Sequence, residues 1–413
     1  MNSIIYNLFL LAIFFQLIPN VNIFGTNHLF FTTNFFSLSI IILLGIYLFS
    51  KPNSNSKLKP RYEILLVLIF LATQAISFIN ALNIQAFILI FISLSAGVLI
   101  FFISKLILNE DEKNVYDVKL QRLNTVVIFA CIVNIIFQSL LLVYPDLIIP
   151  FIRQYLSFNL SEVIFLHFSK NKLYTNFSVE LILPLLFVFI INHKGLKLKL
   201  FSFFLLIIIF TLSFLSNFRY RILGYFFAFF SSIFLYWNSV KNIHKHIFIY
   251  GIFSIIVVSI ISSIFNSKTV INRFTDIEEY QKYSTIQFRL HMYTIAFELG
   301  SSNLFGVGLG NMYDYLQKKT LNEISNNPTN YALTGGAHNI FFQTFAETGL
   351  IGLLSLVILI IFWLLKDIRT LNIATGRNKV YIPMFWTLIV ISQFISSYNT
   401  TFYIFFFLLR GLI

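Results

Sequence analysis

Long apolar segments, separated by shorter polar intervals, recur along the whole chain. Each is about 17–25 residues long, which is enough for an α-helix to cross a hydrocarbon core of about 30 Å. The pattern predicts an all-α integral membrane protein with about twelve transmembrane helices. The expected segments are about 4–20, 31–50, 62–80, 86–107, 124–144, 178–192, 199–216, 222–239, 247–265, 337–365, 380–395 and 401–413.

Two polar intervals on the predicted outer side are long, at about 145–177 and 266–336. Within the second interval, residues 286–302 show the spacing of an amphipathic helix that ends at Gly300. We expect this helix to lie on or dip into the outer leaflet. The longest interval on the inner side, about 108–123, has mixed charge and is expected to be a solvated connector.

Composition agrees with a membrane protein and excludes a soluble globular one, because 58% of the residues are hydrophobic and 52 are phenylalanine. The net charge of +13 is compatible with nucleic-acid binding in principle. However, most Lys and Arg residues fall in the short intervals of one side, as the positive-inside rule requires for cytoplasmic N- and C-termini. The charge therefore reflects topology, and no nucleic-acid partner is predicted.

Polar chemistry concentrates at the predicted outer boundary of the membrane. Glu180 and Glu347 both lie within about three helical turns of that face. A lipid-linked glycan flippase or another transporter remains an alternative, and it predicts charged groups lining a cavity at mid-membrane. The sequence does not show such a pattern.

Three arginines are candidates for binding an anion at this boundary. Arg219 and Arg221 occupy a tight outer turn between two apolar segments, where short outer loops normally avoid arginine. Arg289 lies on the predicted amphipathic helix, and Glu298 is out of phase with it on that helix. Guanidinium groups match phosphate oxygens bidentately, whereas the alternative for all three is snorkelling to lipid headgroups.

His338 stands with Asn339 at the mouth of the segment 337–365, where free N–H groups and the helix dipole favour anions. Asn339, Gln343 and Glu347 form a polar stripe along that helix. Because His338 and Glu347 are roughly 13 Å apart along the axis, they are not expected to act as a direct acid–base pair. His338 is therefore the candidate base, and the alternative is a structural histidine.

Glycines mark places where backbones are expected to approach closely. Gly349 and Gly352 would admit another helix below His338. The run Gly306-Val-Gly308-Leu-Gly310 is expected to be a close backbone contact or a re-entrant turn, because no strand precedes it as in a dinucleotide loop. The acidic residues of 276–279 are expected to be solvated rather than to bind a divalent cation.

The order and spacing of these motifs resemble the O-antigen ligase and polymerase family. Arg289 is followed after ten residues by Gly300, and then by the glycine-rich stretch 304–310. His338-Asn339 is followed after nine residues by Gly349-Leu-Ile-Gly352. The resemblance implies a conserved region over about 200–365, flanked by an N-terminal bundle (1–199) and C-terminal helices (366–413).

Two positions depart from the family pattern. The first arginine appears as Arg219-Tyr220-Arg221, so either arginine could hold the position of the family's first arginine. The aromatic residue that follows the second arginine is Tyr293 here, where the family usually has Trp.

The resemblance implies a GT-C-like glycosyltransferase that inverts configuration and needs neither metal nor cofactor. It would transfer a glycan from undecaprenyl diphosphate to an acceptor sugar hydroxyl. The reaction would take place on the periplasmic face of the bacterial cytoplasmic (inner) membrane. An acceptor that is a second lipid-linked repeat would make it a polysaccharide polymerase, with a possible chain-length regulator as partner. Lipid A-core as acceptor would make it an O-antigen ligase.

In this reaction, fixed cations would stabilise the negative charge on the leaving diphosphate, and a base would accept the proton of the acceptor hydroxyl. The predicted catalytic residues are His338, Arg289, Arg219 and Arg221. The predicted substrate-binding residues are Tyr293, Asn339, Gln343 and Glu347.

Overall fold

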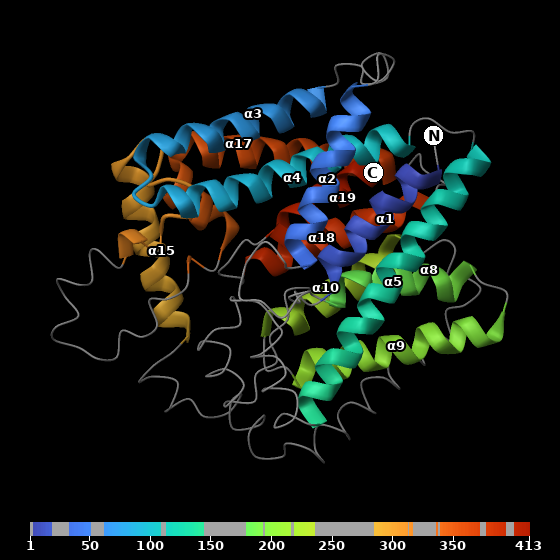
Figure 1. Ribbon diagram of the computed structural model, residues 1–413. Coiled ribbons are helices and arrows are strands. Elements are labelled where there is room, and N and C mark those ends of the chain that lie inside the picture. Colours follow the sequence, from blue (N-terminus) through green and yellow to red (C-terminus); the bar gives the residue numbers. More distant parts are fainter. Residues whose placement is uncertain are drawn as a thin grey trace, which may run out of the picture.

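The computed structural model describes residues 3–18, 33–50, 62–108, 113–143, 179–192, 195–215, 219–235, 285–312, 314–316, 336–337, 339–371, 377–393 and 400–413. Over these residues the protein is all-helical, without strands (Figure 1). The helices are α1 (Ser3–Leu17), α2 (Thr33–Ser50), α3 (Tyr62–Ile76), η2 (Ser77–Asn80), α4 (Ile84–Leu108), α5 (Lys113–Val143), η4 (Val179–Ile182), α8 (Leu183–Asn192), α9 (Leu196–Leu215), α10 (Arg219–Leu235), α15 (Thr285–Ser302), α17 (Ile340–Leu371), η7 (Arg377–Val380), α18 (Tyr381–Ser392) and α19 (Thr400–Leu412).

The apolar segments of the sequence coincide with these helices, except for 247–265, which lies outside the described residues. The described stretches that are long and apolar enough to cross a membrane are Tyr62–Asn80, Ile84–Ile107, Tyr116–Phe137 and Ile340–Thr370. Shorter apolar helical stretches, of 10–17 residues, are Ser3–Leu17, Phe35–Ser50, Glu180–Ile190, Arg221–Leu235, Tyr381–Ser392 and Phe402–Leu412. The all-α membrane class is thus confirmed, whereas twelve spans and a GT-C-like arrangement stay predictions.

The interval after α4 differs from the expectation of a solvated connector over 108–123. Helix α5 already begins at Lys113, so most of this interval is helical. Leu120 and Leu123 are buried, and the Tyr6 hydroxyl donates a hydrogen bond to the backbone oxygen of Lys119. The described part of this interval, 113–123, is therefore a helix that packs on α1 and buries Lys119.

Small residues allow α19 to lie directly against α4. A methyl group on Gly97 would come within 2.6 Å of the Tyr403 carbonyl oxygen, and one on Gly411 would come within 2.7 Å of Ser104 Cβ. Close approach of this kind replaces the hydrophobic driving force that is missing between helices in lipid. The last helix of the chain thereby becomes part of the core.

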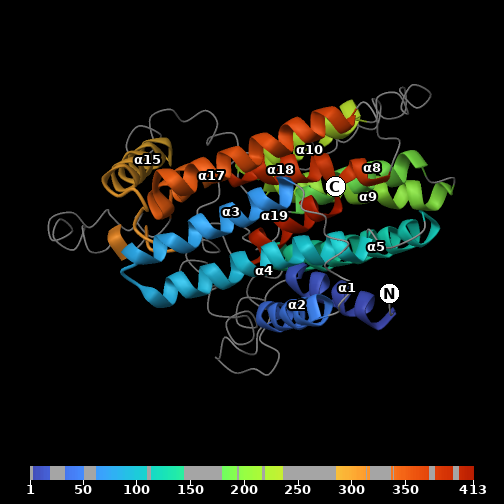
Figure 2. The same ribbon diagram turned by 90° about the horizontal axis from the view of Figure 1, so that it is seen from above.

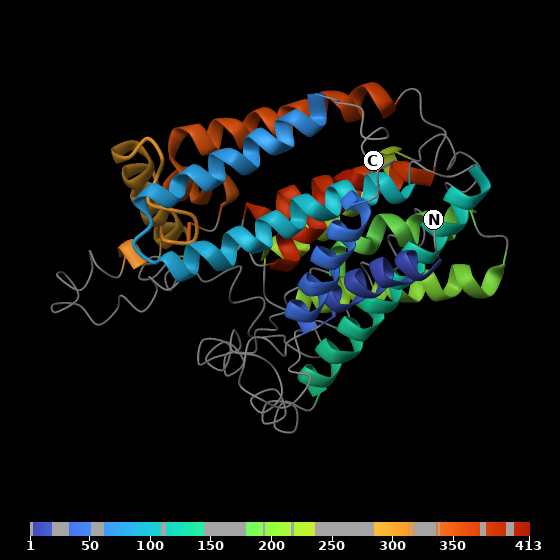
Figure 3. The same cartoon turned by 45° about the horizontal axis from the view of Figure 1, so that its top comes forward.

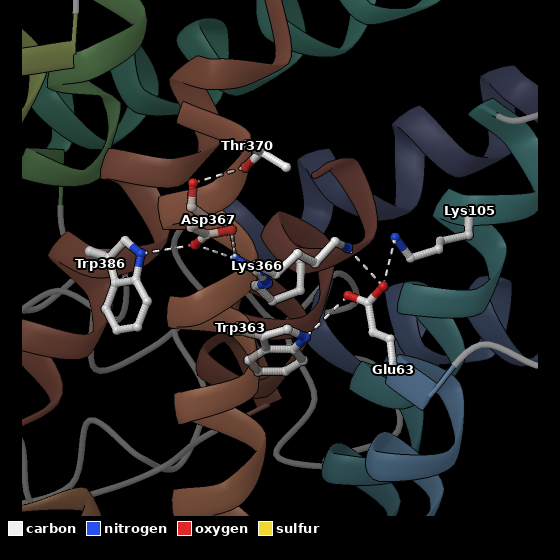
Figure 4. Close-up of polar contacts among 8 residues, drawn as sticks. Glu63, Lys105, Trp363, Lys366, Asp367, Thr370 and Trp386 are labelled. Carbon is white, nitrogen blue, oxygen red and sulfur yellow. Dashed lines mark hydrogen bonds and ion pairs between the residues drawn. The ribbon is translucent and has the colours of Figure 1, made fainter. Parts of the chain in front are cut away.

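A cluster of buried charges, drawn in Figure 4, ties five helices together at one end of the bundle. Its first part surrounds Glu63, at the start of α3. The Glu63 carboxylate lies 2.8 Å from Lys366 Nζ and 3.5 Å from Lys105 Nζ, and it accepts a hydrogen bond from Trp363 Nε1 at 3.1 Å. A carboxylate buried in an apolar bundle needs such partners to offset its lost hydration.

The second part of the cluster surrounds Asp367, at the end of α17. Arg410 Nη1 lies 3.0 and 2.7 Å from the two Asp367 oxygens, and Trp386 Nε1 donates to Asp367 Oδ2 at 2.9 Å. The guanidinium carbon is 4.9 Å from the ring centres of both Trp363 and Phe385. Arginine at this position is thus held by a carboxylate and by two aromatic faces.

The two ends of the bundle differ in a way that agrees with the charge pattern. The charge cluster contains three basic residues, Lys105, Lys366 and Arg410. The positive-inside rule places all three on the cytoplasmic side. Figure 4 labels the two lysines beside Glu63. Helix α15 lies at the opposite end from the chain termini in the three ribbon views (Figures 1–3). Helix α15, which the sequence predicts at the periplasmic face, therefore lies away from the two ends of the chain, which are predicted to be cytoplasmic.

Candidate active site

The structure has a helix, α15, where the sequence predicts an amphipathic helix over 286–302, and the contact of this helix with the outer leaflet stays a prediction. Helix α15 runs from Thr285 to Ser302 and buries Met292 and Ala296. Gly300 does not end this helix, which continues for two more residues. Its lack of a side chain instead allows contact with α17, since a methyl group there would lie 2.6 Å from the Phe345 ring and carbonyl oxygen.

Two aromatic contacts set the register between α15 and the first part of α17. Tyr293 stacks on Phe342 with ring centres 4.5 Å apart and an interplanar angle of 8°. One turn further on, Phe297 meets Phe345 at 5.7 Å. The second contact lies further along both helices than the first. Helix α15 and the first part of α17 therefore run in the same direction along this interface. Arg289, one turn before Tyr293, is partly exposed.

Helix α17 is broken at Gly349, whose backbone angles are φ 66° and ψ −166°. Such a break frees backbone carbonyls that must find partners inside an apolar bundle. The Ala346 carbonyl accepts from Val307 N at 3.0 Å, and the Glu347 carbonyl accepts from Gly308 N at 2.8 Å. The glycine-rich turn 303–311 is therefore docked on the break.

Glycine is required at this contact because the backbones touch. A methyl group on Gly349 would collide with the Leu304 carbonyl, and one on Gly306 would collide with the backbone of Glu347. The expected close backbone contact at 306–310 is thus confirmed. At Gly349 the expected neighbour was another helix, but the segment that approaches is the glycine-rich turn. At Gly352 the neighbour is a helix, because a methyl group there would lie 3.2 Å from Gln74 Nε2 of α3.

Asparagines fasten the other side of the turn to the connection between α3 and α4. Asn80 Nδ2 donates to the Gly306 carbonyl at 2.8 Å. The Asn311 side chain accepts from Asn83 N at 2.5 Å and donates to the Asn83 carbonyl at 3.2 Å. Sequence reasoning missed these residues, although a set of asparagines at the outer helix ends was the available signal.

The polar stripe of α17 forms hydrogen bonds within the protein. Asn339 caps the helix by accepting from Phe341 N at 2.9 Å, and its Nδ2 donates to Gln393 Oε1 at 2.9 Å. Gln343 Nε2 donates to Glu347 Oε1. Both Gln343 and Glu347 are buried, at 7% and 6% exposure. A role for these side chains in binding sugar stays a prediction.

The two arginines at the start of α10 differ in what the structure describes. Arg221 is buried, with its Nε 2.7 Å from Glu180 Oε1, and Ser213 Oγ donates to the same oxygen at 2.5 Å. The sequence placed Glu180 near the outer face without recognising it as a partner of Arg221. The side chain of Arg219 lies outside the described residues, and positions 219 and 221 point to different sides of a helix.

His338 also lies outside the described residues, as does the acidic stretch 276–279. The chain neighbours of His338, Ala337 and Asn339, are described. The structure therefore places the flanks of the predicted base, and it brings together Tyr293, Asn339, Gln343 and Glu347 around the start of α17. Arg221 belongs to a separate contact with η4.

Together these features define a multi-pass membrane protein with a candidate site at the end of its helices. Residues 203–357 match the family described as O-antigen ligase. The chain thus carries a domain of the O-antigen ligase and polymerase family, whose members are glycosyltransferase-like, and the predicted resemblance is confirmed. Every predicted site residue lies within the matched segment. Among individual curated proteins, none matches the chain.

Replacing Gly349 by alanine should weaken the docking of the turn. Alanine would be strained at this positive φ and would also collide with Leu304, so we expect a loss of about 2 kcal/mol or more. Thermal unfolding in detergent would show this as a lowered melting temperature. Gly195→Ala is the matched control, since a methyl group there meets no atom within 4 Å. Equal effects of both substitutions would contradict the docking role.

Proposed function

We propose that this protein is a glycosyltransferase that moves a glycan from undecaprenyl diphosphate to an acceptor sugar hydroxyl at the periplasmic face of the inner membrane. The family match supports a ligase or polymerase type of reaction. The observation that carries the residue assignment is the parallel register of α15 and the first part of α17.

That register relates the second arginine to the predicted base. Tyr293 stacks on Phe342, and Arg289 and His338 are each four residues earlier in their own segments. Four residues correspond to about one helical turn, so Arg289 lies on the same side of α15 as Tyr293. We infer that Arg289 and His338, which precedes the start of α17 by two residues in the chain, act on the same reacting groups.

A cation and a base that act together can promote displacement of a diphosphate. The bond from the sugar carbon to the diphosphate oxygen breaks, and the electron pair leaves with the diphosphate. Arg289 would stabilise that charge, because a guanidinium group stays protonated and binds phosphate oxygens in pairs. His338 would take the proton from the acceptor hydroxyl as its oxygen forms the new bond. Tyr293 would line the sugar. No metal is needed in this scheme.

Arg219 is the better candidate for the second phosphate contact. The Arg221 guanidinium already binds the Glu180 carboxylate in a buried pair. Arg221 would therefore hold the start of α10, while Arg219, on a different side of the helix, contributes charge to the site. This proposal assigns separate roles to the two arginines that the family pattern left open.

His338→Ala and Arg289→Ala should each lower glycan transfer by about 100-fold or more, in line with lost proton transfer and lost charge stabilisation. The measurement is transfer by purified protein in proteoliposomes, supplied with lipid-linked oligosaccharide and acceptor. His291→Ala, an exposed histidine on α15, and Arg122→Ala, an exposed arginine on α5, are matched controls.

Transfer at the wild-type rate by both variants would contradict the proposal. The assay includes a chelator in a parallel reaction. Activity that is lost with chelator and restored by a divalent cation would instead assign a metal to the reaction. The acidic residues of 276–279 would then be its candidate ligands.

Arg219→Ala and Arg221→Ala should fail in different ways. Arg219→Ala should lose transfer and keep its melting temperature. Arg221→Ala leaves the buried Glu180 carboxylate without this partner and should lose about 3–5 kcal/mol of stability. Thermal unfolding in detergent and the transfer assay are compared for both, and Glu180→Gln with Arg221→Met should recover stability. The reverse pattern would exchange the two roles.

The choice of acceptor determines the biological role, and we propose a polymerase. In a deletion strain, loss of a polymerase should leave single capped repeats on the lipopolysaccharide core, seen as a collapsed ladder on a gel. Absence of any repeat on the core, with accumulation of the lipid-linked chain, would identify a ligase instead.

A further inference from the structure

Both chain neighbours of His338 take part in hydrogen bonds with polar side chains, of which Gln343 is buried and Gln393 is half-buried. On one side, the backbone N–H of Ala337 donates to Gln343 Oε1 at 2.6 Å. On the other side, Asn339 caps α17 and is joined to Gln393 of α18.

The contact at Ala337 is one end of a chain of hydrogen bonds. Gln343 uses its oxygen for Ala337 and its NH₂ group for Glu347 Oε1. This order follows from the Ala337 N–H, which can only donate, so the Gln343 oxygen must face it and the NH₂ group is left for Glu347. Reversing the Gln343 amide would place two donors together at one end and two acceptors at the other.

The other end of the chain reaches the break in α17. Glu347 lies two residues before Gly349, and its own carbonyl accepts from Gly308 N of the docked turn. The backbones of Gly310 and Met312 also lie beside its carboxyl group. The chain therefore runs from the turn, through Glu347 and Gln343, to the residue that precedes His338.

We propose that Gln343 and Glu347 are positioning residues, which hold the backbone at Ala337, next to the predicted base His338, from the docked turn rather than binding sugar themselves. The catalytic consequence of this inference rests on the proposed function. The hydrogen bond between Gln343 and Ala337 does not depend on that function. Both side chains are buried and their functional groups are directed at each other. A carboxyl group buried beside apolar helices needs such donors. This need explains the amide of Gln343 one helical turn before Glu347.

An exchange of the two residues separates positioning from sugar binding. Gln343→Ala removes the chain, and Gln343→Glu places two carboxylates side by side. The double variant Gln343→Glu/Glu347→Gln restores it, because a carboxylate at 343 accepts from both Ala337 N–H and the new amide at 347. Gln121→Ala, an exposed glutamine on α5, is the control.

The first measurement is amide hydrogen exchange of the full-length protein in detergent, followed over the peptide that contains residues 336–342. Gln343→Ala and Gln343→Glu should speed exchange at this peptide, and the exchanged double variant should return it to the wild-type rate. Unchanged exchange in both single variants would overturn the proposal, whether or not the protein proves to be a transferase.

The second measurement is transfer kinetics with lipid-linked donor and acceptor. Gln343→Ala should lower kcat by about 10- to 100-fold and leave both KM values within about twofold, as for a displaced catalytic group. The exchanged variant should recover most of kcat. A raised KM for donor or acceptor, with no recovery on exchange, would show that these side chains bind sugar and would overturn the proposal. Absence of transfer by the wild-type protein would refute the proposed function alone.

Discussion

The break of α17 at Gly349 is the constraint on which the rest of the site depends. In an unbroken helix the carbonyls of Ala346 and Glu347 would be bonded by residues four positions later. Here they are bonded by Val307 and Gly308 of a turn that precedes α17 in the chain. Because an unpaired carbonyl among apolar helices is costly, the turn and the break stabilise each other.

This mutual dependence explains why a short piece of helix can act as a rigid part of the site. The first segment of α17, before Gly349, is attached to the turn at one end and to Gln393 at the other. Helix α15 packs along its side through Tyr293 and Phe342. Arg289 and Tyr293, which we assign to chemistry, thus belong to a helix whose position is set by ring contacts with this segment.

Much of this architecture follows from local pattern, and the remainder does not. Apolar length predicts the helices, and amphipathic spacing predicts α15, because these properties depend on residues close in sequence. The pairing of Arg221 with Glu180 joins residues 41 positions apart, and that of Lys366 with Glu63 joins residues 303 apart. Local periodicity carries no information on such pairs. Similarly, glycine spacing indicated close contact at Gly349 without indicating that the helix breaks there.

The charge cluster at the far end of the bundle has a consequence for how the chain is assembled. Helices are made from the N-terminus onward, so Glu63 of α3 is joined first by Lys105 of α4, the next helix in the chain. Asp367 of α17 is followed by Trp386 and then Arg410. Each of the two carboxylates in this cluster therefore finds a donor in the next described α-helix to be synthesised. Biogenesis can thus proceed without leaving an uncompensated charge in lipid for long.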